Sequence, residues 1–462
     1  MYQNNTIIAL ATPSGAGAIA VIRLSGPEAI SMVDAFFKSI HAKKLASQKT
    51  HTIHLGHIIE GSTILDEVLV SVFKNPQSYT GEDVVEISCH GSSYIQQEII
   101  QLFVRNGARI ANPGEFTLRA FLNAKLDLSQ AEAVADLIAS DNKASHQIAM
   151  QQMRGGFSNE IKVLRDELLN FASLIELELD FSEEDVEFAD RKQFEDLLAR
   201  IIKVLKHLID SFSTGNVIKN GIPISIIGAP NVGKSTLLNA LLNEDKAIVS
   251  DIAGTTRDAI EDEITIEGIK FRFIDTAGIR TTDDTIESIG IKKTFEKITQ
   301  SQVVLYLLDA SKVSSDTIVL FNTDIRKIQE QYPDKKLIVV ANKMDQANQT
   351  FIESSFVYPH TLFTSAKSGL GIDSLKSKLL EFVNTGALRN NDTIITNSRH
   401  YDSLLKALTD VQKVQQGMDA KLSGDLLAID IRQALYHFGE ISGEITSDDL
   451  LGNIFANFCI GK

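Results

Sequence analysis

The sequence predicts a multidomain chain in which an α/β domain is inserted into a helical domain that follows an α+β domain. Three features support this prediction. Short alternating apolar runs, with Gly and Pro between them, fill residues 1–122. Amphipathic helical patterns fill residues 123–215 and return at residues 384–462. Apolar strands alternate with helical stretches at residues 216–383, which is the pattern of a doubly wound α/β domain.

The N-terminal residues contain four runs that favour strands and one that favours a helix. Residues 6–11, 18–24, 67–73 and 83–88 predict the strands, and residues 93–105 predict the helix. His51, His54 and His57 are residues of a type that binds metal, but their setting favours a polar strand or loop.

The helical domain is predicted from periodicity and capping signals. Ser129 and Glu132 form a capping-box pattern, and a long helix should run from there to about Arg154, where Gly155 and Gly156 end it. Further helices are predicted at about 158–180, 191–213, 399–416, 424–439 and 447–458, with a linker at 215–221. One helical domain with an inserted domain is the simplest arrangement, because insertion needs only termini that lie close together. Two separate helical domains are the alternative.

Composition restricts the class of protein. The length of 462 residues suffices for two to four domains, and the apolar and charged fractions of 44% and 23% are ordinary for a globular protein. The net charge of -15 argues against a broad basic face for nucleic acid or anionic membrane. Cys89 and Cys459 lie far apart in the sequence and fit a reducing cytoplasm. We find no zinc spacing, signal peptide or membrane-spanning run in the sequence.

Gly228-Ala-Pro-Asn-Val-Gly-Lys-Ser235 directly follows an apolar strand predicted at residues 222–227. This string is a complete phosphate-binding loop, in which glycines let backbone N–H groups surround phosphates at a helix N-terminus. Lys234 should reach the β and γ phosphates, and the hydroxyl of Ser235 should bind Mg2+. Such a loop alone could serve ATP or GTP.

Asn342-Lys-Met-Asp345 decides between the two bases. It follows the apolar strand predicted at residues 337–340, as a base-binding loop should. The carboxylate of Asp345 can accept hydrogen bonds from N1–H and the 2-amino group of guanine, whereas adenine offers neither donor. Ser365-Ala-Lys367 follows another strand and should supply a backbone N–H to the guanine oxygen. The nucleotide is therefore predicted to be GTP.

Two further strings are expected to contact Mg2+ and the γ phosphate. In Gly254-Thr-Thr-Arg-Asp258 we assign Thr256 as a Mg2+ ligand that senses the γ phosphate. In Asp275-Thr-Ala-Gly278 we expect Asp275 to hold Mg2+ through a water and Gly278 to contact the γ phosphate. The next residue is Ile279, which cannot orient the attacking water.

Chemistry alone leaves three ways to replace the missing water-orienting residue. An arginine could act as a finger, a carboxylate could orient the water, or a second cation could take the place of the finger. The candidates are Arg257 and Arg280 for the first, Asp283, Asp284 and Glu287 for the second, and Asn231 as a ligand for the third.

Four strings make the chain similar to one family along its whole length. They are Asn231 with Gly254-Thr-Thr-Arg-Asp258, Pro113-Gly-Glu-Phe116 through Leu126-Asp-Leu128, Ile441-Ser-Gly-Glu-Ile-Thr-Ser-Asp-Asp449, and the terminal Cys459-Ile-Gly-Lys462. On these strings the chain resembles the bacterial tRNA-modification GTPase family MnmE (TrmE). The resemblance implies an N-terminal α+β tetrahydrofolate-binding-like domain at residues 1–122 that also serves dimerisation, a discontinuous helical domain and an inserted Ras-like P-loop G domain.

The resemblance also implies roles at the nucleotide site. It implies that K+ fills the arginine-finger position, that Glu287 orients the water, and that Asn231 and Lys234 assist catalysis. The implied metal ligands are Asn231, Ser250, Ile252 and Thr255 for K+, and Ser235 and Thr256 for Mg2+. The implied GTP contacts are Asn231, Val232, Gly233, Lys234, Ser235, Thr236, Ser250, Asp251, Ile252, Ala253, Gly254, Thr255, Thr256, Asp275, Thr276, Ala277, Gly278, Asn342, Lys343, Met344, Asp345, Ser365, Ala366 and Lys367.

A second site is implied in the N-terminal domain. The family's contacts to a 5-formyltetrahydrofolate-type one-carbon donor map to Arg23, Glu86, Lys125 and Lys462. Cations suit the carboxylates of a folate, and a carboxylate suits its pterin edge. Without the resemblance, Arg23 and Lys125 would be interpreted as solvated surface charges. Cys459 would be a small, partly buried side chain, but the family tail brings it toward the folate pocket and makes it a candidate catalytic residue.

The function that the resemblance implies is a K+-activated GTPase that forms a homodimer through its G domains in the cytoplasm. With a flavoprotein partner of the MnmG/GidA type, which carries FAD and uses NADH, it would form a heterotetramer. This complex would add a carboxymethylaminomethyl or aminomethyl group to C5 of the wobble uridine (position 34) of certain tRNAs, with no membrane or DNA partner. The alternatives are a regulatory or ribosome-assembly GTPase switch and a folate-dependent enzyme with a regulatory GTPase. The terminal tail and the N-terminal domain favour tRNA modification, because a switch alone has no use for a folate site.

Overall fold

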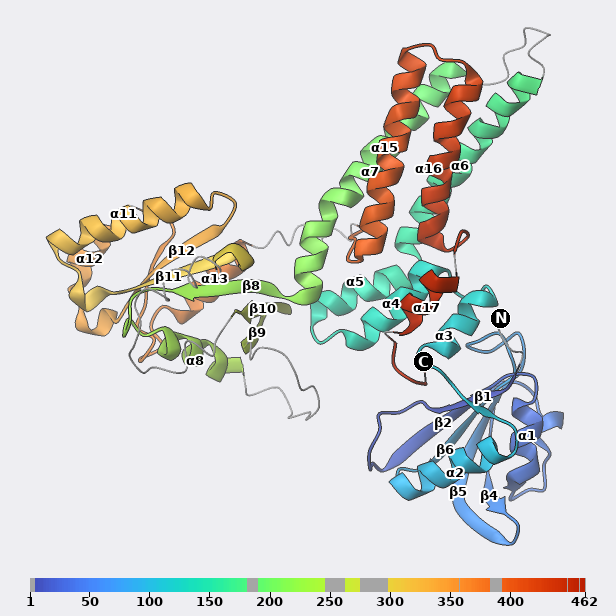
Figure 1. Cartoon of the computed structure of the whole chain (residues 1–462). Coiled ribbons are helices and arrows are strands. Elements are labelled where there is room, and N and C mark those ends of the chain that lie inside the picture. The colour runs from blue at the N-terminus through green and yellow to red at the C-terminus, as the bar shows by residue number, and fades with distance from the viewer. Residues whose placement is uncertain are drawn as a thin grey trace. The chain divides into compact units, whose positions relative to one another are not determined.

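The computed structural model describes residues 5–180, 190–245, 262–274, 298–356, 358–382, 393–446, 448–456 and 458–461 (Figure 1). The chain divides into two compact units. The first contains Met1–Ala139, Ala149–Lys206 and Ser398–Lys462, and the second contains Ser140–Ile148 and His207–Asn397. The first unit therefore combines sequence from both sides of the second.

The N-terminal part of the first unit is a seven-stranded sheet with the order β3-β4-β5-β6-β2-β1-β7. Two helices, α1 (Ala29–Phe36) and α2 (Ser93–Arg105), pack on one face through a core that includes Val33, Val70 and Phe103. The strands are β1 (Ile7–Leu10), β2 (Ile19–Ser25), β3 (Phe37–Ser39), β4 (Thr52–Glu60), β5 (Thr63–Phe73), β6 (Val84–His90) and β7 (Arg109–Ile110).

The predicted strands and the predicted helix at residues 93–105 are confirmed, while α1, β3 and β7 have no counterpart in the prediction. The histidine cluster lies on β4. His54 is buried and its ring bonds the Thr52 hydroxyl at 2.9 Å, whereas the next histidine, His57, lies 3.4 Å from the carboxylate of Glu67. Among the described residues, no group of three or more His, Cys, Asp or Glu side chains is placed to hold a metal ion.

The helical part of the first unit brings together helices from the two ends of the sequence. Its α16 packs against both α15 and α6, and Figure 1 shows these three running side by side. The helices that lie wholly in this part are α3 (Glu115–Leu122), α4 (Leu128–Ala139), α6 (Gly156–Asp180), α15 (Ser398–Asp419), α16 (Gly424–Ser442) and α17 (Asp448–Ala456). The helices α5 (Lys143–Met153) and α7 (Arg191–Asn220) are divided between the two units.

One helix prediction and one linker prediction were wrong. The long helix expected from Ser129 to Arg154 is broken into α4 and α5, because Asn142 accepts a hydrogen bond from the N–H of Ser145 at 2.9 Å and caps a new helix. The linker expected at residues 215–221 is instead the last part of α7, which continues to Asn220. Gly215 serves close packing there, since a Cβ atom would lie 2.1 Å from the carbonyl oxygen of Ile395.

The capping box of α4 lies two residues before the predicted one. Asp127 accepts a hydrogen bond from the N–H of Gln130 at 2.8 Å, and the side chain of Gln130 accepts one from the N–H of Asp127 at 3.0 Å. This is the reciprocal pattern of a capping box. Ser129 and Glu132, which were predicted to form it, are both buried instead.

Glu132 is the centre of a buried ion cluster. Its carboxylate accepts hydrogen bonds from Nε and Nη2 of Arg399 at 2.9 and 2.8 Å and lies 2.7 Å from Nε2 of His400. Arg399 also donates to the carbonyl oxygens of Glu440 and Ile441 near the end of α16. Burial raises the pKa of Glu132, but the charge and hydrogen bonds of His400 and Arg399 outweigh it and lower this pKa to about 2. The cluster thus joins α4 to α15 and α16.

The second unit contains a six-stranded sheet with the order β13-β12-β11-β8-β10-β9, in which only the β9–β10 pair is antiparallel. The strands predicted at residues 222–227 and 337–340 are confirmed as β8 (Ile222–Ile227) and β12 (Lys336–Asn342). The other strands of the sheet are β9 (Asp262–Ile266), β10 (Ile269–Phe273), β11 (Val303–Asp309) and β13 (Thr361–Phe363). One core packs α8 (Lys234–Asp245) and α13 (Ile372–Glu381) on the sheet, and a separate core packs α11 (Ser315–Gln331) and α12 (Gln349–Ser355). This layering is the α/β pattern expected from the sequence. Within the described part of the chain, no helix has both the length and the hydropathy of a membrane span.

Replacing Glu132 by Gln should lower the free energy of unfolding by about 3 kcal/mol at neutral pH, because the change breaks a buried ion pair from one side. The folded pKa lies below the ordinary value of 4.5, so the stabilisation is present above that pH and is lost as the pH falls toward about 2. Guanidinium unfolding at several pH values should therefore show a steeper acid loss in the wild type than in Glu132→Gln. Asp402→Asn, which alters an exposed carboxylate on α15, is the control. Parallel pH curves for wild type and Glu132→Gln would contradict this account.

Candidate functional site

The phosphate-binding loop lies between the end of β8 and the start of α8, at the carboxyl edge of the sheet. Gly228 and Gly233 have φ angles of +149° and +99°. A Cβ atom at Gly228 would lie 2.2 Å from the carbonyl oxygen of Leu307, and one at Gly233 would lie 2.4 Å from Nδ2 of Asn342. Only glycine fits at either position. The loop is therefore packed against the backbone of Leu307 and the side chain of Asn342, and it ends at the N-terminus of α8, where anions are favoured.

Lys234, Ser235 and Thr236 form the first turn of α8. The ammonium group of Lys234 donates to the carbonyl oxygens of Gly228 and Ala229 at 2.8 and 2.9 Å, so its charge lies over the loop. This arrangement puts one positive charge and the N-terminal end of a helix dipole at the same point.

Asn342 connects the three loops of the site. Its Nδ2 donates to the carbonyl oxygen of Val232 at 3.0 Å, and its Oδ1 accepts from the N–H of Ala366 at 2.9 Å. Asn342 is buried, so both hydrogen bonds are shielded from water. The residue therefore fixes the phosphate loop and the Ser365–Lys367 loop relative to the end of β12.

Lys343 adds a second connection. It has a left-handed backbone with φ +67°, and its ammonium group donates to the carbonyl oxygen of Asn231 at 2.8 Å and to the carboxylate of Asp309 at 2.7 Å. Asn231 is itself left-handed, with φ +63°, and is exposed. Burial opposes ionisation of Asp309, but hydrogen bonds from Lys343 and Ser311 outweigh it and hold the pKa of that carboxyl below its ordinary value. Asp309 therefore fixes the ammonium group of Lys343, which in turn holds the phosphate loop at Asn231.

Asp345 is placed as an acceptor for a base. Its side chain accepts a hydrogen bond from the Ser365 hydroxyl at 2.7 Å, and this bond lowers the pKa of Asp345. The preceding residue, Met344, is held by a hydrogen bond from its N–H to the carbonyl oxygen of Thr364 at 3.0 Å. Oδ2 of Asp345 also accepts a hydrogen bond from Nε2 of Gln346 at 3.3 Å. An ionised carboxylate has about four lone-pair sites, so it can still accept from guanine N1–H and the 2-amino group.

In the first unit, Arg23 and Glu86 are directly opposite each other on β2 and β6. Both Nε and Nη2 of Arg23 lie 2.8 Å from the Glu86 carboxylate, and the guanidinium carbon lies 5.5 and 5.6 Å from the ring centres of Tyr79 and Phe116. The Arg23 side chain is only 17% exposed, so it is not the solvated surface charge that the sequence alone would suggest.

The C-terminal tail reaches the same place. Nη1 of Arg23 donates to the carbonyl oxygen of Gly461 at 3.3 Å. Gly461 has φ +94°, and a Cβ atom there would lie 2.1 Å from the carbonyl oxygen of Leu10. The carbonyl oxygen of Cys459 accepts from the N–H of Gly114 at 3.3 Å, while the Cys459 residue is exposed. Lys125 is also exposed and bonds the carbonyl oxygen of Pro76, so the structure does not pair it with Arg23 or Glu86.

Comparison with known proteins identifies the family. The model of the MnmE helical domain matches residues 128–459, and the model described as the GTP-binding protein TrmE N-terminus matches residues 6–125. The tRNA modification GTPase MnmE of Christiangramia forsetii is 66% identical over 474 residues, and that of Flavobacterium johnsoniae is 67% identical over 467 residues. Each comparison covers 100% of both chains. The chain belongs to the MnmE family.

Membership of the MnmE family makes this chain a GTP hydrolase that acts in tRNA modification. Among solved structures, the G domain of the T. maritima FeoB iron transporter is 22% identical and covers 35% of this chain and 97% of its own, with a TM-score of 0.24. That score is too low to carry an argument.

Several predicted residues of this MnmE family member lie outside the described residues. At the nucleotide site they are Ser250, Asp251, Ile252, Ala253, Gly254, Thr255, Thr256, Arg257, Asp275, Thr276, Ala277, Gly278, Ile279, Arg280, Asp283, Asp284 and Glu287, and at the folate site Lys462. At the nucleotide site, the structure therefore brings together the phosphate loop and the two base loops. At the predicted folate site, it brings together Arg23, Glu86 and the C-terminal tail.

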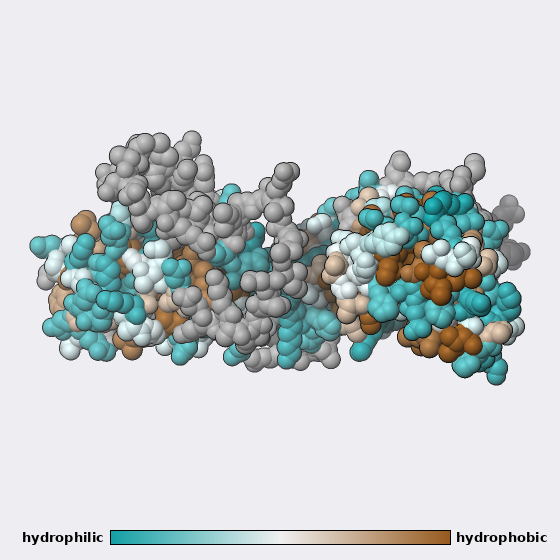
Figure 2. All heavy atoms as spheres, turned by 90° about the horizontal axis from the view of Figure 1, so that it is seen from below, coloured by the Kyte–Doolittle hydropathy of each residue, from teal (hydrophilic) through white to brown (hydrophobic). Residues whose placement is uncertain are grey.

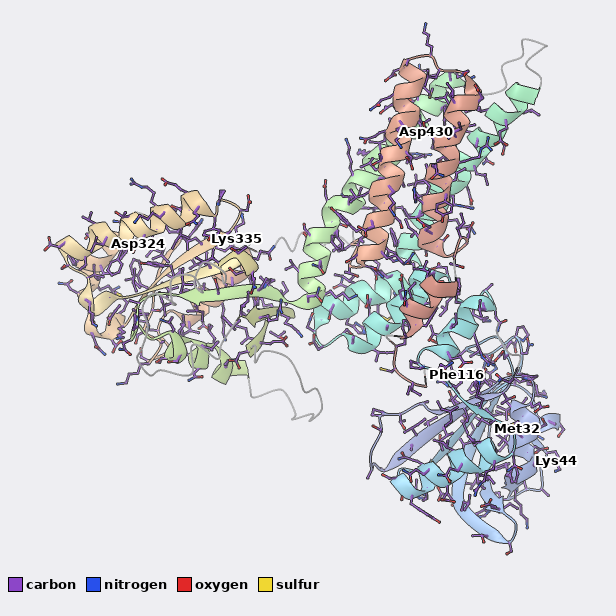
Figure 3. All side chains as sticks on the ribbon, viewed as in Figure 1. Met32, Lys44, Phe116, Asp324, Lys335 and Asp430 are labelled. Atoms are coloured by element: carbon purple, nitrogen blue, oxygen red, sulfur yellow. The ribbon has the colours of Figure 1, made fainter. Side chains whose placement is uncertain are left out.

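Sequence reasoning missed Arg119, which organises the surroundings of Arg23. This residue is 3% exposed and donates to the carboxylates of Glu82 and Glu115 at 2.9 and 3.1 Å and to the carbonyl oxygen of Asn5 at 2.9 Å. It thereby ties the loop that carries Tyr79 to the helix that carries Phe116. Its position three residues after the Pro113-Gly-Glu-Phe116 string was the available signal. Figure 3 marks Phe116 on this side of the sheet.

Asp345→Asn should weaken GTP binding by on the order of 100-fold, because two hydrogen bonds to a charged acceptor are lost at about 1.5 kcal/mol or more each. Xanthosine triphosphate has a carbonyl group in place of the 2-amino group, so it should bind this variant better than GTP does. Fluorescence titration with both nucleotides measures the change. The exposed Asp373→Asn on α13 is the control. Unchanged GTP affinity in Asp345→Asn would reject the assignment of the base loop.

Proposed function

We propose that this chain is a K+-activated GTPase that, with a flavoprotein partner of the MnmG/GidA type, installs an aminomethyl-type or carboxymethylaminomethyl group at C5 of the wobble uridine (position 34) of certain tRNAs. One observation carries the proposal: a single chain holds a guanine-type nucleotide site and, in its other unit, an Arg23–Glu86 pair met by the C-terminal tail. A GTPase that only switches between states has no use for the second site. Relatives named tRNA modification GTPase MnmE match both parts over the full length.

At the nucleotide site we propose that Ser235 and Thr256 bind Mg2+, and that Asn231, Ser250, Ile252 and Thr255 bind K+. Asn231 suits a hard cation, because it is an exposed amide on a backbone held by Lys343. Bound K+ would supply the positive charge that an arginine finger supplies elsewhere. Glu287 would orient the attacking water in place of the glutamine that Ile279 replaces, and Lys234 would hold the phosphates.

At the second site we propose that Arg23, Glu86, Lys125 and Lys462 bind a 5-formyltetrahydrofolate-type donor. The residues present suit such a ligand. A guanidinium group close to two aromatic rings can bind a carboxylate, and Glu86 can accept hydrogen bonds from a pterin edge. The donor supplies a one-carbon unit when bound. Cys459 is exposed on the tail that meets Arg23 and is the candidate nucleophile there.

The assembly that we propose is a homodimer through the G domains, joined by the flavoprotein into a heterotetramer in the cytoplasm. FAD and NADH would be bound by the partner. GTP-driven closure of the G-domain dimer would then drive the successive steps of the tRNA modification in this complex.

The GTPase rate should rise at least about tenfold when K+ replaces Na+ at equal ionic strength, while GTP affinity changes little, because K+ would act on developing charge in the transition state. Phosphate release and nucleotide titration in the two salts measure both quantities. Equal rates in K+ and Na+ would reject the K+ site.

Cells that lack this protein should contain tRNAs whose wobble uridines carry no C5 aminomethyl-type group. Nucleoside analysis of their total tRNA measures this directly, and restoring the wild-type protein is the control. A normal nucleoside profile in the deletion strain would overturn the proposed function and favour the regulatory switch.

A further inference from the structure

One segment of the N-terminal domain differs sharply in charge from the rest of the chain. Residues 35–59 contain four lysines and four histidines and no Asp or Glu, in a protein of net charge -15. Lys38, Lys43, Lys44 and Lys49, which we call the lysine edge, are all exposed. They lie on β3, the outermost strand of its sheet, and on the turns that follow it. Figure 3 marks Lys44 near the margin of this domain, beyond Met32 of α1.

The backbone under the lysine edge is held in place. Leu45 is fully buried in the core, and its N–H donates to the carboxylate of Asp34 at 2.8 Å. The ammonium group of Lys74 donates to the carbonyl oxygen of Ala46 at 2.8 Å. These contacts fix the turn that separates Lys44 from Lys49. The lysines are therefore presented by an ordered surface, which reduces the entropy lost when a ligand binds.

No carboxylate neutralises the lysine edge. Within the described part of the chain, none of its four ammonium groups lies within 4.0 Å of an Asp or Glu carboxylate. The acidic side chains of nearby strands have other partners: Glu67 lies 3.4 Å from the ring of His57, and Glu60 lies 3.2 Å from the guanidinium of Arg105. Burial, and then the charge of Lys43, lower the pKa of His54. The positive field of the edge thus reaches the neighbouring strand.

We propose that the lysine edge is a docking surface for the sugar-phosphate backbone of tRNA. Clustered, unpaired lysines match a row of phosphates, and neutralising phosphates is the main source of affinity for nucleic acids. An anionic membrane is the less suitable partner, because membrane-surface binding generally uses a basic amphipathic helix with a continuous apolar face, and these lysines lie on a strand and turns. Figure 2 shows hydrophilic and hydrophobic areas side by side on one face of the molecule, and the exposed hydrophobic side chains in this segment are Ile40, Ile53 and Leu55.

The location suits a substrate that must also reach the folate pocket. Four strand spacings separate β3 from β2, which carries Arg23. At about 4.8 Å per spacing this is about 19 Å along one sheet. A tRNA held at the edge by one part of its backbone is large enough to extend over that distance. The inference therefore names the RNA-binding surface of the function proposed above and depends on that function.

The test compares two triple variants of the full-length protein. Lys43→Gln/Lys44→Gln/Lys49→Gln removes three charges from the lysine edge. The control, Lys312→Gln/Lys327→Gln/Lys336→Gln, removes three exposed lysines of the other unit, so each variant changes the net charge from -15 to -15 - 3 = -18. Binding of an unmodified tRNA transcript is measured from about 50 to about 250 mM KCl, together with GTP binding.

The lysine-edge variant should bind tRNA on the order of 10- to 100-fold more weakly at low salt, and the slope of log affinity against log salt should fall by about 2 to 3. The control variant should bind tRNA like the wild type, and GTP binding should be the same in all three proteins.

Equal tRNA affinities in the two variants, or no tRNA binding by the wild type, would overturn the inference. Loss of binding to phosphatidylserine vesicles by the lysine-edge variant, with its tRNA binding retained, would also overturn the inference. An altered nucleoside profile in the deletion strain, together with unchanged tRNA binding by the lysine-edge variant, would reject this surface and leave the proposed function intact.

Discussion

The buried carboxylate of Glu132 binds the guanidinium of Arg399, 267 residues later in the chain. This contact, with His400 and the end of α16, joins the helical sequence on the two sides of the second unit, and the packing of α16 on α6 joins it as well. An unpaired charge at this depth would cost several kcal/mol, so each half of the cluster requires the other. The two stretches of helical sequence therefore form one fold.

The position of the C-terminal tail follows from this closure. Leu451 and Phe455 of α17 pack with Leu118 of α3 and Leu128 of α4 in one small core. The chain then continues to Gly461, whose carbonyl oxygen meets Arg23. Cys459 lies two residues before that contact, is exposed, and accepts a hydrogen bond at its carbonyl oxygen from the N–H of Gly114. The helical fold thus delivers the last residues of the chain to a site built by its first.

The two sites differ in how much of each the sequence could predict. The phosphate loop and the Asn342–Asp345 loop are local strings whose chemistry follows from residue type and spacing, so their positions at the ends of β8 and β12 were predictable. Asp309 was not, because its role depends on a lysine from the neighbouring strand end. Arg119 was missed for the same reason, since two of its partners, Glu82 and Asn5, lie 37 and 114 residues away.

The wrong predictions share a cause. The capping pattern at Ser129 and Glu132 is valid as a string, but tertiary burial turned Glu132 toward Arg399 and left the cap to Asp127 and Gln130. Gly215 looks like a linker residue in sequence, and only the approach of Ile395 shows why glycine stands inside a helix. The net charge of -15 is a sum over the whole chain, so it does not reveal a local group of lysines such as the lysine edge.

We expect two chemically different sites in one chain to serve a single modification. The most direct measurement is nucleoside analysis of tRNA from deletion cells that express either Asp345→Asn or Glu86→Ala as their only copy. Purified Glu86→Ala should still bind GTP, and purified Asp345→Asn should still bind the folate donor. The account predicts that each variant alone abolishes the same C5 modification of the wobble uridine. Full modification with either variant would contradict it.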